Sequence, residues 1–323
     1  MKSLSIFRSS FFFSLGTLLS RFFGLLREAI IAGVFGASSS MDAFLVANRI
    51  PNLLRELLAE GALGSSFTKV FTEMKSHNPK KAHSLLINML AFVCLISLVL
   101  CVLAYFLAPY FVSGLTLLEV EDKKFIDETV SLTRILFPFI GLMSLGAIFS
   151  SVLHERGRFG LSSVSSVGLN LGYIFGALVL TPWLVSQGSQ TKLYFTSSPA
   201  ITGLALGVLL GGFLQILLPF FYVWKHFLRK ISWQKISFWN KDLKEVFLLM
   251  TPMIIASSAG QINILINTNF ATSLETGAVT WLNFSFRLLQ LPVGLFAVAV
   301  GTVSLPALSR LSITTERDKF SKK

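Results

Sequence analysis

The chain has 323 residues, of which 53% are hydrophobic and only 14% are charged, and its mean hydropathy is +0.70. A soluble globular domain has about 25% charged residues, so this composition excludes an ordinary soluble protein. The net charge of +12 would suit a nucleic-acid-binding protein, but its distribution along the chain argues against nucleic acid as a partner.

Several segments are long and apolar enough to cross a bilayer as helices, which takes about 20 mostly apolar residues. The eight predicted spans are residues 10–36, 41–72, 84–112, 129–154, 160–184, 199–224, 243–272 and 277–306. No period-two alternation recurs, and backbone groups in lipid must be hydrogen-bonded internally. The pattern therefore predicts an all-α polytopic membrane protein. Because Arg21 interrupts the first segment and no small-residue cleavage site follows it, we expect this segment to be retained.

The basic residues fix the predicted orientation. With the N-terminus inside, most of the 28 Lys and Arg residues fall in inner loops, whereas the outer loops hold only Lys123, Lys124 and Lys192. The positive-inside rule then predicts that both termini are cytoplasmic. Residues 225–242 interleave basic and aromatic side chains, which predicts an interfacial linker on anionic lipids. The acidic outer stretch 117–128, "LLEVEDKKFIDE", is expected to be solvated.

The first two segments carry ionisable residues where they are costly. An arginine at mid-membrane costs about 2.5–3.5 kcal/mol on insertion scales, and such residues usually face a bundle interior or a water-filled cavity. The polar and charged residues concerned are Arg21, Arg27, Glu28, Asp42, Arg49, Asn52, Arg55, Glu56 and Glu60, with Arg287 in the eighth segment. We also expect Pro51 to kink the second segment.

Helical spacing groups these residues on shared faces. Asn52 and Arg55 fall on one stripe, and Arg49, Glu56 and Glu60 fall on a neighbouring stripe. One interpretation is that acids and bases pair among themselves, for example Arg27 with Glu28. The other is that some positive charge remains for an anionic ligand, and the planar fork of arginine suits phosphate. Both alternatives stay open at this point.

The sequence predicts no metal site and no disulfide. Cys94 and Cys101 lie about 10 Å apart along one predicted helix, which is too far for a disulfide. The four histidines fall near loops without ligand spacing.

Residues 20–67, "SRFFGLLREAIIAGVFGASSSMDAFLVANRIPNLLRELLAEGALGSSF", resemble the MurJ (MviN) family of lipid II flippases, within the multidrug/oligosaccharidyl-lipid/polysaccharide (MOP) exporter superfamily. The resemblance resumes at "LFPFIGLMSLGAIFSSVLHERGRF", at "GLNLGYIFGAL" and at "INTNFATSLETGAVTWLNFSFRLLQLPVGLFAVAVGTVSLPALSRL". It implies an exporter-like helical bundle in the bacterial inner membrane. It also implies a transporter, not an enzyme, that flips the undecaprenyl-pyrophosphate-linked peptidoglycan precursor to the outer leaflet by alternating access.

The resemblance also assigns roles to residues and partners. It implies that Arg21, Arg27, Arg55 and Arg287 bind the pyrophosphate in a central cavity, and that Asp42 lies near an outer gate. The residues expected in gating or supporting roles are Glu28, Asp42, Arg49, Asn52, Glu56 and Glu60. The expected partners are lipid II, anionic lipids and the cell-wall synthesis machinery. No ATP-binding glycine-rich motif is present, so we expect no cofactor and a membrane potential or ion gradient as the drive.

The chain departs from the family pattern in two places. Glu56 stands where the family often has a second arginine, and Phe286 stands where it often has an acid, with Gln290 at the nearby carboxylate position. Salt-bridge gating at those positions therefore does not carry over.

Length is a larger departure. The family has about fourteen spans in two repeated lobes with the site at their interface, whereas eight are predicted here. A shift of 235 residues aligns Asn48 with Asn283, so we expect a first lobe at 1–224, a linker at 225–242 and the first two helices of a second lobe at 243–323. The alternatives are an inactive fragment or scaffold, an exporter of another polyprenyl-linked glycan, and, least favoured, a membrane enzyme acting on lipid-linked sugars.

Overall fold

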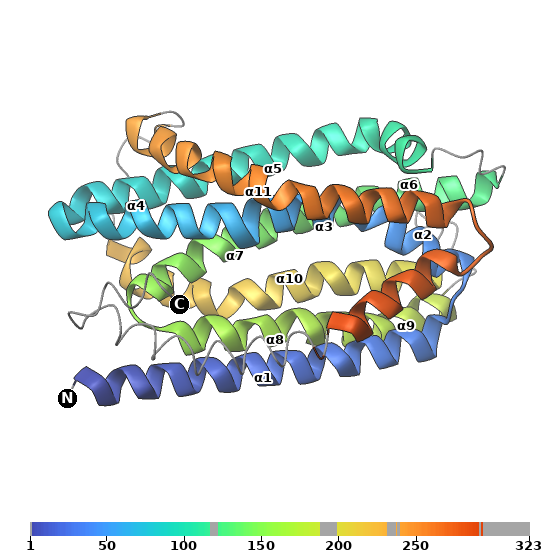
Figure 1. The fold of residues 1–323 in the computed structure, drawn as a ribbon, viewed down its shortest axis with the longest axis horizontal. Helices are drawn as coiled ribbons and strands as arrows, with labels where there is room; N and C mark the ends of the chain where they lie inside the picture. Colours follow the sequence, from blue (N-terminus) through green and yellow to red (C-terminus); the bar gives the residue numbers. More distant parts are fainter. Residues whose placement is uncertain are drawn as a thin grey trace, which may run out of the picture. The chain divides into compact units, whose positions relative to one another are not determined.

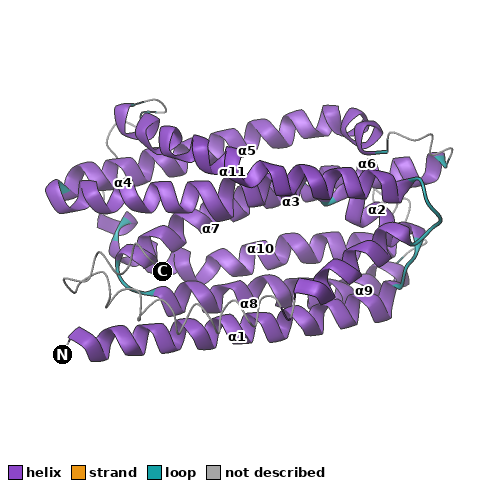
Figure 2. Cartoon of the chain, in the orientation of Figure 1, coloured by secondary structure: helices purple, strands orange, loops and turns teal. Residues whose placement is uncertain are grey.

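The computed structural model describes residues 2–116, 122–187, 199–230, 237, 240–290 and 292 (Figure 1). All regular structure within these ranges is helical, which confirms the predicted all-α class (Figure 2). The chain divides into two compact units, Met1–Val279 and Thr280–Lys323, and each is described by itself. The predicted lobes at 1–224 and 243–323 stay a prediction.

The first predicted segment forms one continuous helix, α1 (Lys2–Phe35). It ends at Gly36, whose φ of +57° is the left-handed conformation that commonly stops a helix and that glycine adopts without strain. Ser38 then caps the next helix by accepting a hydrogen bond from the Met41 amide at 3.3 Å.

The second predicted segment is a broken helix with four parts. They are α2 (Ser39–Ala47), α3 (Arg49–Leu54), the π-helix η1 (Arg55–Leu63) and α4 (Gly64–His77). The break at Asn48 follows from Pro51, which has no N–H for the Ala47 carbonyl and whose ring clashes with it. A π-helix inserted in an α-helix is rare and frequently marks a functional site.

The remaining helices follow in chain order. They are α5 (Pro79–Leu115), α6 (Lys123–Leu136), α7 (Pro138–Glu155), α8 (Phe159–Phe175), η2 (Gly176–Leu180), α9 (Thr181–Ser186), α10 (Pro199–His226), η3 (Leu228–Lys230) and α11 (Lys241–Thr272), and residues 278–290 are also helical.

Five helical stretches in the described ranges are long and apolar enough to cross a membrane. They are Pro79–Leu115, Lys123–Glu155, Phe159–Ser186, Ala200–His226 and Lys241–Thr272. The total of eight spans and the cytoplasmic location of both termini stay predictions. Part of the predicted eighth span and residues 231–236 and 238–239 of the predicted linker lie outside the described residues.

Small residues let α8 and α10 approach closely, and the two helices lie side by side in Figure 1. A Cβ atom added to Gly172 would lie 2.1 Å from the Gly211 Cα, and one added to Gly207 would lie 2.6 Å from the Gly176 Cα. Backbone contact through glycines is a common way for helices to associate in membranes, where the hydrophobic effect gives little drive. Helix α1 packs along α8.

We expect Gly172→Ala to destabilise the bundle by about 3 kcal/mol, because the added methyl group forces α8 and α10 apart. The matched control is Gly33→Ala on α1, where a Cβ would meet no atom within 4 Å and the gain in helix propensity is about 1 kcal/mol. Thermal unfolding in detergent measures both. Equal melting temperatures for the two variants would contradict the close packing.

Candidate functional site

Arg27 is held on α1 by its neighbour and by an aromatic ring. Its Nε and Nη2 atoms both donate to Glu28 Oε1, at 3.1 and 2.5 Å. The guanidinium also lies 4.7 Å from the ring centroid of Tyr173 on α8, which gives a cation–π contact. The side chains of Arg27 and Glu28 are only 11% and 19% exposed. Of the two interpretations left open by the sequence, pairing of acids with bases holds for Arg27 and Glu28.

The packing of α1 on α8 explains this position. Asn170 of α8 donates to the Ser20 carbonyl at 3.0 Å, and Gly16 lies against Ser163. These contacts fix the register that brings Tyr173 over Arg27. Arg21, the other predicted arginine of α1, is half-buried six residues earlier.

A second polar group lies where α3 passes into η1. Arg55 Nη2 donates to Glu56 Oε1 at 3.2 Å, and Arg55 Nε donates to Asn52 Oδ1 at 2.9 Å. Asn52 Nδ2 donates to Glu56 Oε1 at 2.8 Å, and Gln261 Nε2 of α11 donates to Glu56 Oε2. We call these four residues the Glu56 network. It joins η1 to α11 through side chains.

Sequence reasoning missed Gln261 and Tyr173 as partners of the predicted arginines. Gln261 had a visible signal, because it is an amide in the interior of a helix that is otherwise apolar enough to span a membrane. Tyr173 had none, because nothing in its local pattern distinguishes it from an ordinary buried aromatic.

Asp42 is buried near the N-terminus of α2, with 5% of the residue exposed. Its Oδ2 atom accepts a hydrogen bond from the backbone N–H of Gly277 at 2.6 Å. Gly277 has φ of +95°, a conformation that other residues rarely adopt, so glycine is needed to present this N–H. The contact connects α2 to the segment that follows α11.

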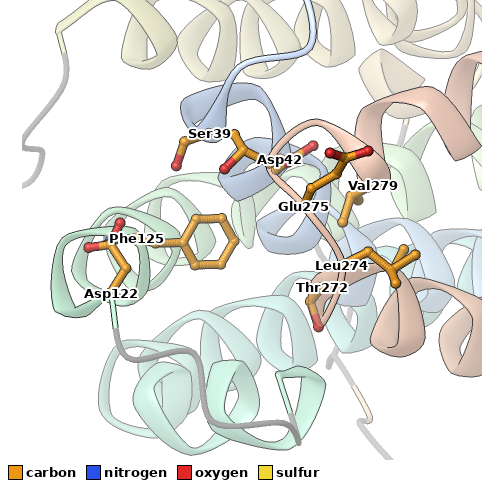
Figure 3. Close-up of a pocket in the computed structure, with 10 residues that line it drawn as sticks. Ser39, Asp42, Asp122, Phe125, Thr272, Leu274, Glu275 and Val279 are labelled. Carbon is orange, nitrogen blue, oxygen red and sulfur yellow. The ribbon is translucent and has the colours of Figure 1, made fainter.

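Asp42 also lines a pocket of about 130 Å³ at this end of the first unit. Figure 3 shows that α2, α6 and the segment after α11 all contribute lining side chains, among them Asp122, Phe125 and Glu275. Glu128 of α6 is 3% exposed and accepts a hydrogen bond from Ser40 of α2 at 3.2 Å. The expectation that residues 117–128 are simply solvated is therefore wrong for Glu128, because α2 packs over this face of α6.

Three of the predicted residues remain to be placed. Arg49 is half-buried on α3. Arg287 belongs to the second unit, where its Nε donates to Asn283 Oδ1 at 3.0 Å and its side chain is exposed. The side chain of Glu60 is outside the described residues.

Comparison with known proteins identifies the family of the chain. The sequence profile of the family described as "Lipid II flippase MurJ" matches residues 31–323. The lipid II flippase MurJ of Burkholderia cenocepacia is 35% identical over 326 residues, covering 98% of this chain and 60% of the relative. The probable lipid II flippase MurJ of Vibrio cholerae is 34% identical, covering 99% of this chain and 59% of the relative.

A solved structure has the same fold. "Lipid II flippase MurJ, inward closed conformation" superposes with a TM-score of 0.73 at 26% identity, covering 94% of this chain and 59% of that one. The chain thus spans about 60% of the length of the relatives it matches. Its apolar helices and these relatives make it a multi-pass protein of the bacterial inner membrane. The family is named for a transporter and not for a catalyst, and the chain belongs to it: this is a member of the MurJ lipid II flippase family.

Proposed function

We propose that the chain flips lipid II across the inner membrane and that its arginines bind the pyrophosphate. The observation that carries this proposal is the burial of two guanidinium groups in a member of this family: the side chains of Arg27 and Arg55 are 11% and 14% exposed. Leaving a diphosphate unpaired in an apolar environment is prohibitively costly. Arginines inside the helical bundle lower that cost through charge-assisted, bidentate hydrogen bonds.

In the proposed mechanism the substrate replaces carboxylates that already occupy the arginines. Arg27 is paired with Glu28 and Arg55 with Glu56, so each guanidinium is oriented before the substrate arrives. We assign Arg21 to the same anion-binding set, with Arg49 and Glu60 as supporting residues, and the role of Arg287 stays a prediction. The polyprenyl tail stays in lipid while the headgroup crosses.

Alternating access requires one end of the molecule to open while the other is closed. The bond from Gly277 N–H to Asp42 ties α2 to the segment after α11 at the end predicted to face outward. We propose that opening on this side breaks that bond. A membrane potential or an ion gradient supplies the drive in this proposal, with no bound cofactor.

Replacing Asp42 should loosen this closure. We expect Asp42→Ala to speed labelling of a Ser39→Cys reporter in the pocket by a membrane-impermeant maleimide, by about tenfold, because a charge-assisted hydrogen bond contributes about 1.5–3 kcal/mol. Cys94 and Cys101 are first replaced by alanine. Asp42→Asn keeps an acceptor oxygen and should label at an intermediate rate; equal rates for all three proteins would contradict the closure.

The function itself is tested by reconstituting the 323-residue chain in vesicles with fluorescent lipid II and measuring access of the headgroup to an external quencher. Translocation faster than in protein-free vesicles is expected. No acceleration would favour the inactive fragment or scaffold. Acceleration with another polyprenyl-diphosphate glycan but not with lipid II would favour an exporter of that glycan.

A further inference from the structure

Glu56 is the acceptor at the centre of the Glu56 network. Its two carboxylate oxygens accept from donors on three helical segments: Asn52 on α3, Arg55 on η1 and Gln261 on α11. One oxygen serves both Asn52 and Arg55, and the other serves Gln261. A single carboxylate thus fixes the guanidinium and links it to a helix more than 200 positions away in sequence.

The side chains of Arg55 and Glu56 differ in their exposure to solvent, and this difference bears on anion binding. The Arg55 side chain is 14% exposed and the Glu56 side chain is 31% exposed. The carboxylate is therefore the more solvated partner, and leaving it without the guanidinium costs less than leaving the more buried guanidinium without a partner. An anion that approaches Arg55 at Nη2 meets a donor that Glu56 already occupies.

The Nε atom of Arg55 makes a second hydrogen bond, to a residue other than Glu56. It donates to Asn52 Oδ1 at 2.9 Å, so the guanidinium keeps an orienting contact when the Nη2 atom exchanges partners. Asn52 in turn donates to Glu56 at 2.8 Å, so the three side chains close a ring of hydrogen bonds. Exchange of the carboxylate for a phosphate oxygen at Nη2 conserves the number of charge-assisted hydrogen bonds.

From this geometry we infer that Glu56 is a positioning residue and an intramolecular competitor of the diphosphate at Arg55. It orients the guanidinium in the absence of substrate, and its displacement frees the Gln261 contact between η1 and α11. The inference rests on the proposed function, because it specifies how the arginine of that site is presented. It predicts a gain in affinity on removing the charge of Glu56, which a purely structural role would not produce.

The test measures binding of farnesyl diphosphate to the 323-residue chain in nanodiscs, with farnesol as the uncharged reference. We expect Glu56→Gln to bind about tenfold more tightly than the wild type at low salt, because the competing charge is removed while the side chain keeps its size. The gain should shrink at high salt and vanish in the Arg55→Ala background. Glu56→Asp keeps the competing charge and should bind with the affinity of the wild type.

The matched control is Glu73→Gln, the same charge change at an exposed position of α4, which should leave affinity unchanged.

A second variant keeps the inference testable if Glu56→Gln does not fold. Asn52→Asp adds a competing carboxylate beside Arg55 Nε and should weaken binding about tenfold. Equal or weaker binding by folded Glu56→Gln, or no weakening by Asn52→Asp, overturns the inference while leaving the proposed function in place. If the wild type does not bind, or if Arg55→Ala binds as well as the wild type, the proposed function fails and the inference fails with it.

Discussion

Replacing Arg55 by alanine should reduce lipid II translocation by about 100-fold or more. While Nε stays bonded to Asn52, the terminal nitrogens of the guanidinium can donate two charge-assisted hydrogen bonds to a diphosphate. Loss of two such bonds at about 1.5–3 kcal/mol each accounts for this reduction. Vesicle translocation measures the effect directly. Growth of cells depleted of their own flippase provides a second readout.

The control is a second arginine in another setting. Arg134 on α6 donates to the Tyr105 carbonyl at 3.0 Å and lies 4.6 Å from the centroid of that ring, with no part in the proposed site. We expect Arg134→Ala to translocate at the wild-type rate. Normal translocation by Arg55→Ala, at wild-type membrane abundance, would remove the chemical basis of the proposed site.

Arg27→Ala should be equally inactive, but for two separable reasons. The variant loses an anion-binding group, and it also takes away the guanidinium from which the poorly exposed Glu28 accepts two hydrogen bonds. Breaking a buried ion pair on one side costs about 3–5 kcal/mol, so the melting temperature should fall.

The double variant Arg27→Ala/Glu28→Ala separates these effects. Removal of both charges should recover most of the lost stability, because no carboxylate is left behind, while translocation stays at background. Thermal unfolding and vesicle translocation are measured on the same preparations. Recovery of translocation in the double variant would show that Arg27 serves only to neutralise Glu28.

The helical class and the polar residues could be predicted because membranes impose simple rules on sequence. A lipid environment requires long apolar helices, and any charge within them stands out against that background. The same rule singled out Arg27, Arg55 and Asp42, whose low exposure the structure confirms. The break near Pro51 followed from local chemistry, since the missing N–H is a property of one residue.

The π-helix η1 could not be predicted from periodicity. The stripes on the second segment assumed 3.6 residues per turn, but η1 begins at Arg55 and bonds each residue to the fifth one along, so the faces rotate there. Asn52, Arg55 and Glu56, expected on two neighbouring stripes, meet in one hydrogen-bonded ring at spacings of three and four residues, which adjacent stripes of a helix allow.

The sequence by itself determined which residues are ionisable inside an apolar chain, because solvation costs depend on residue type and on the surrounding composition. Only the tertiary structure decided which partners those residues have. Gln261 reaches Glu56, Gly277 reaches Asp42 and Tyr173 covers Arg27 because helices distant in sequence pack together. Such pairings depend on helix register and rotation, which are set by close packing such as that between the glycines of α8 and α10 and not by any local pattern.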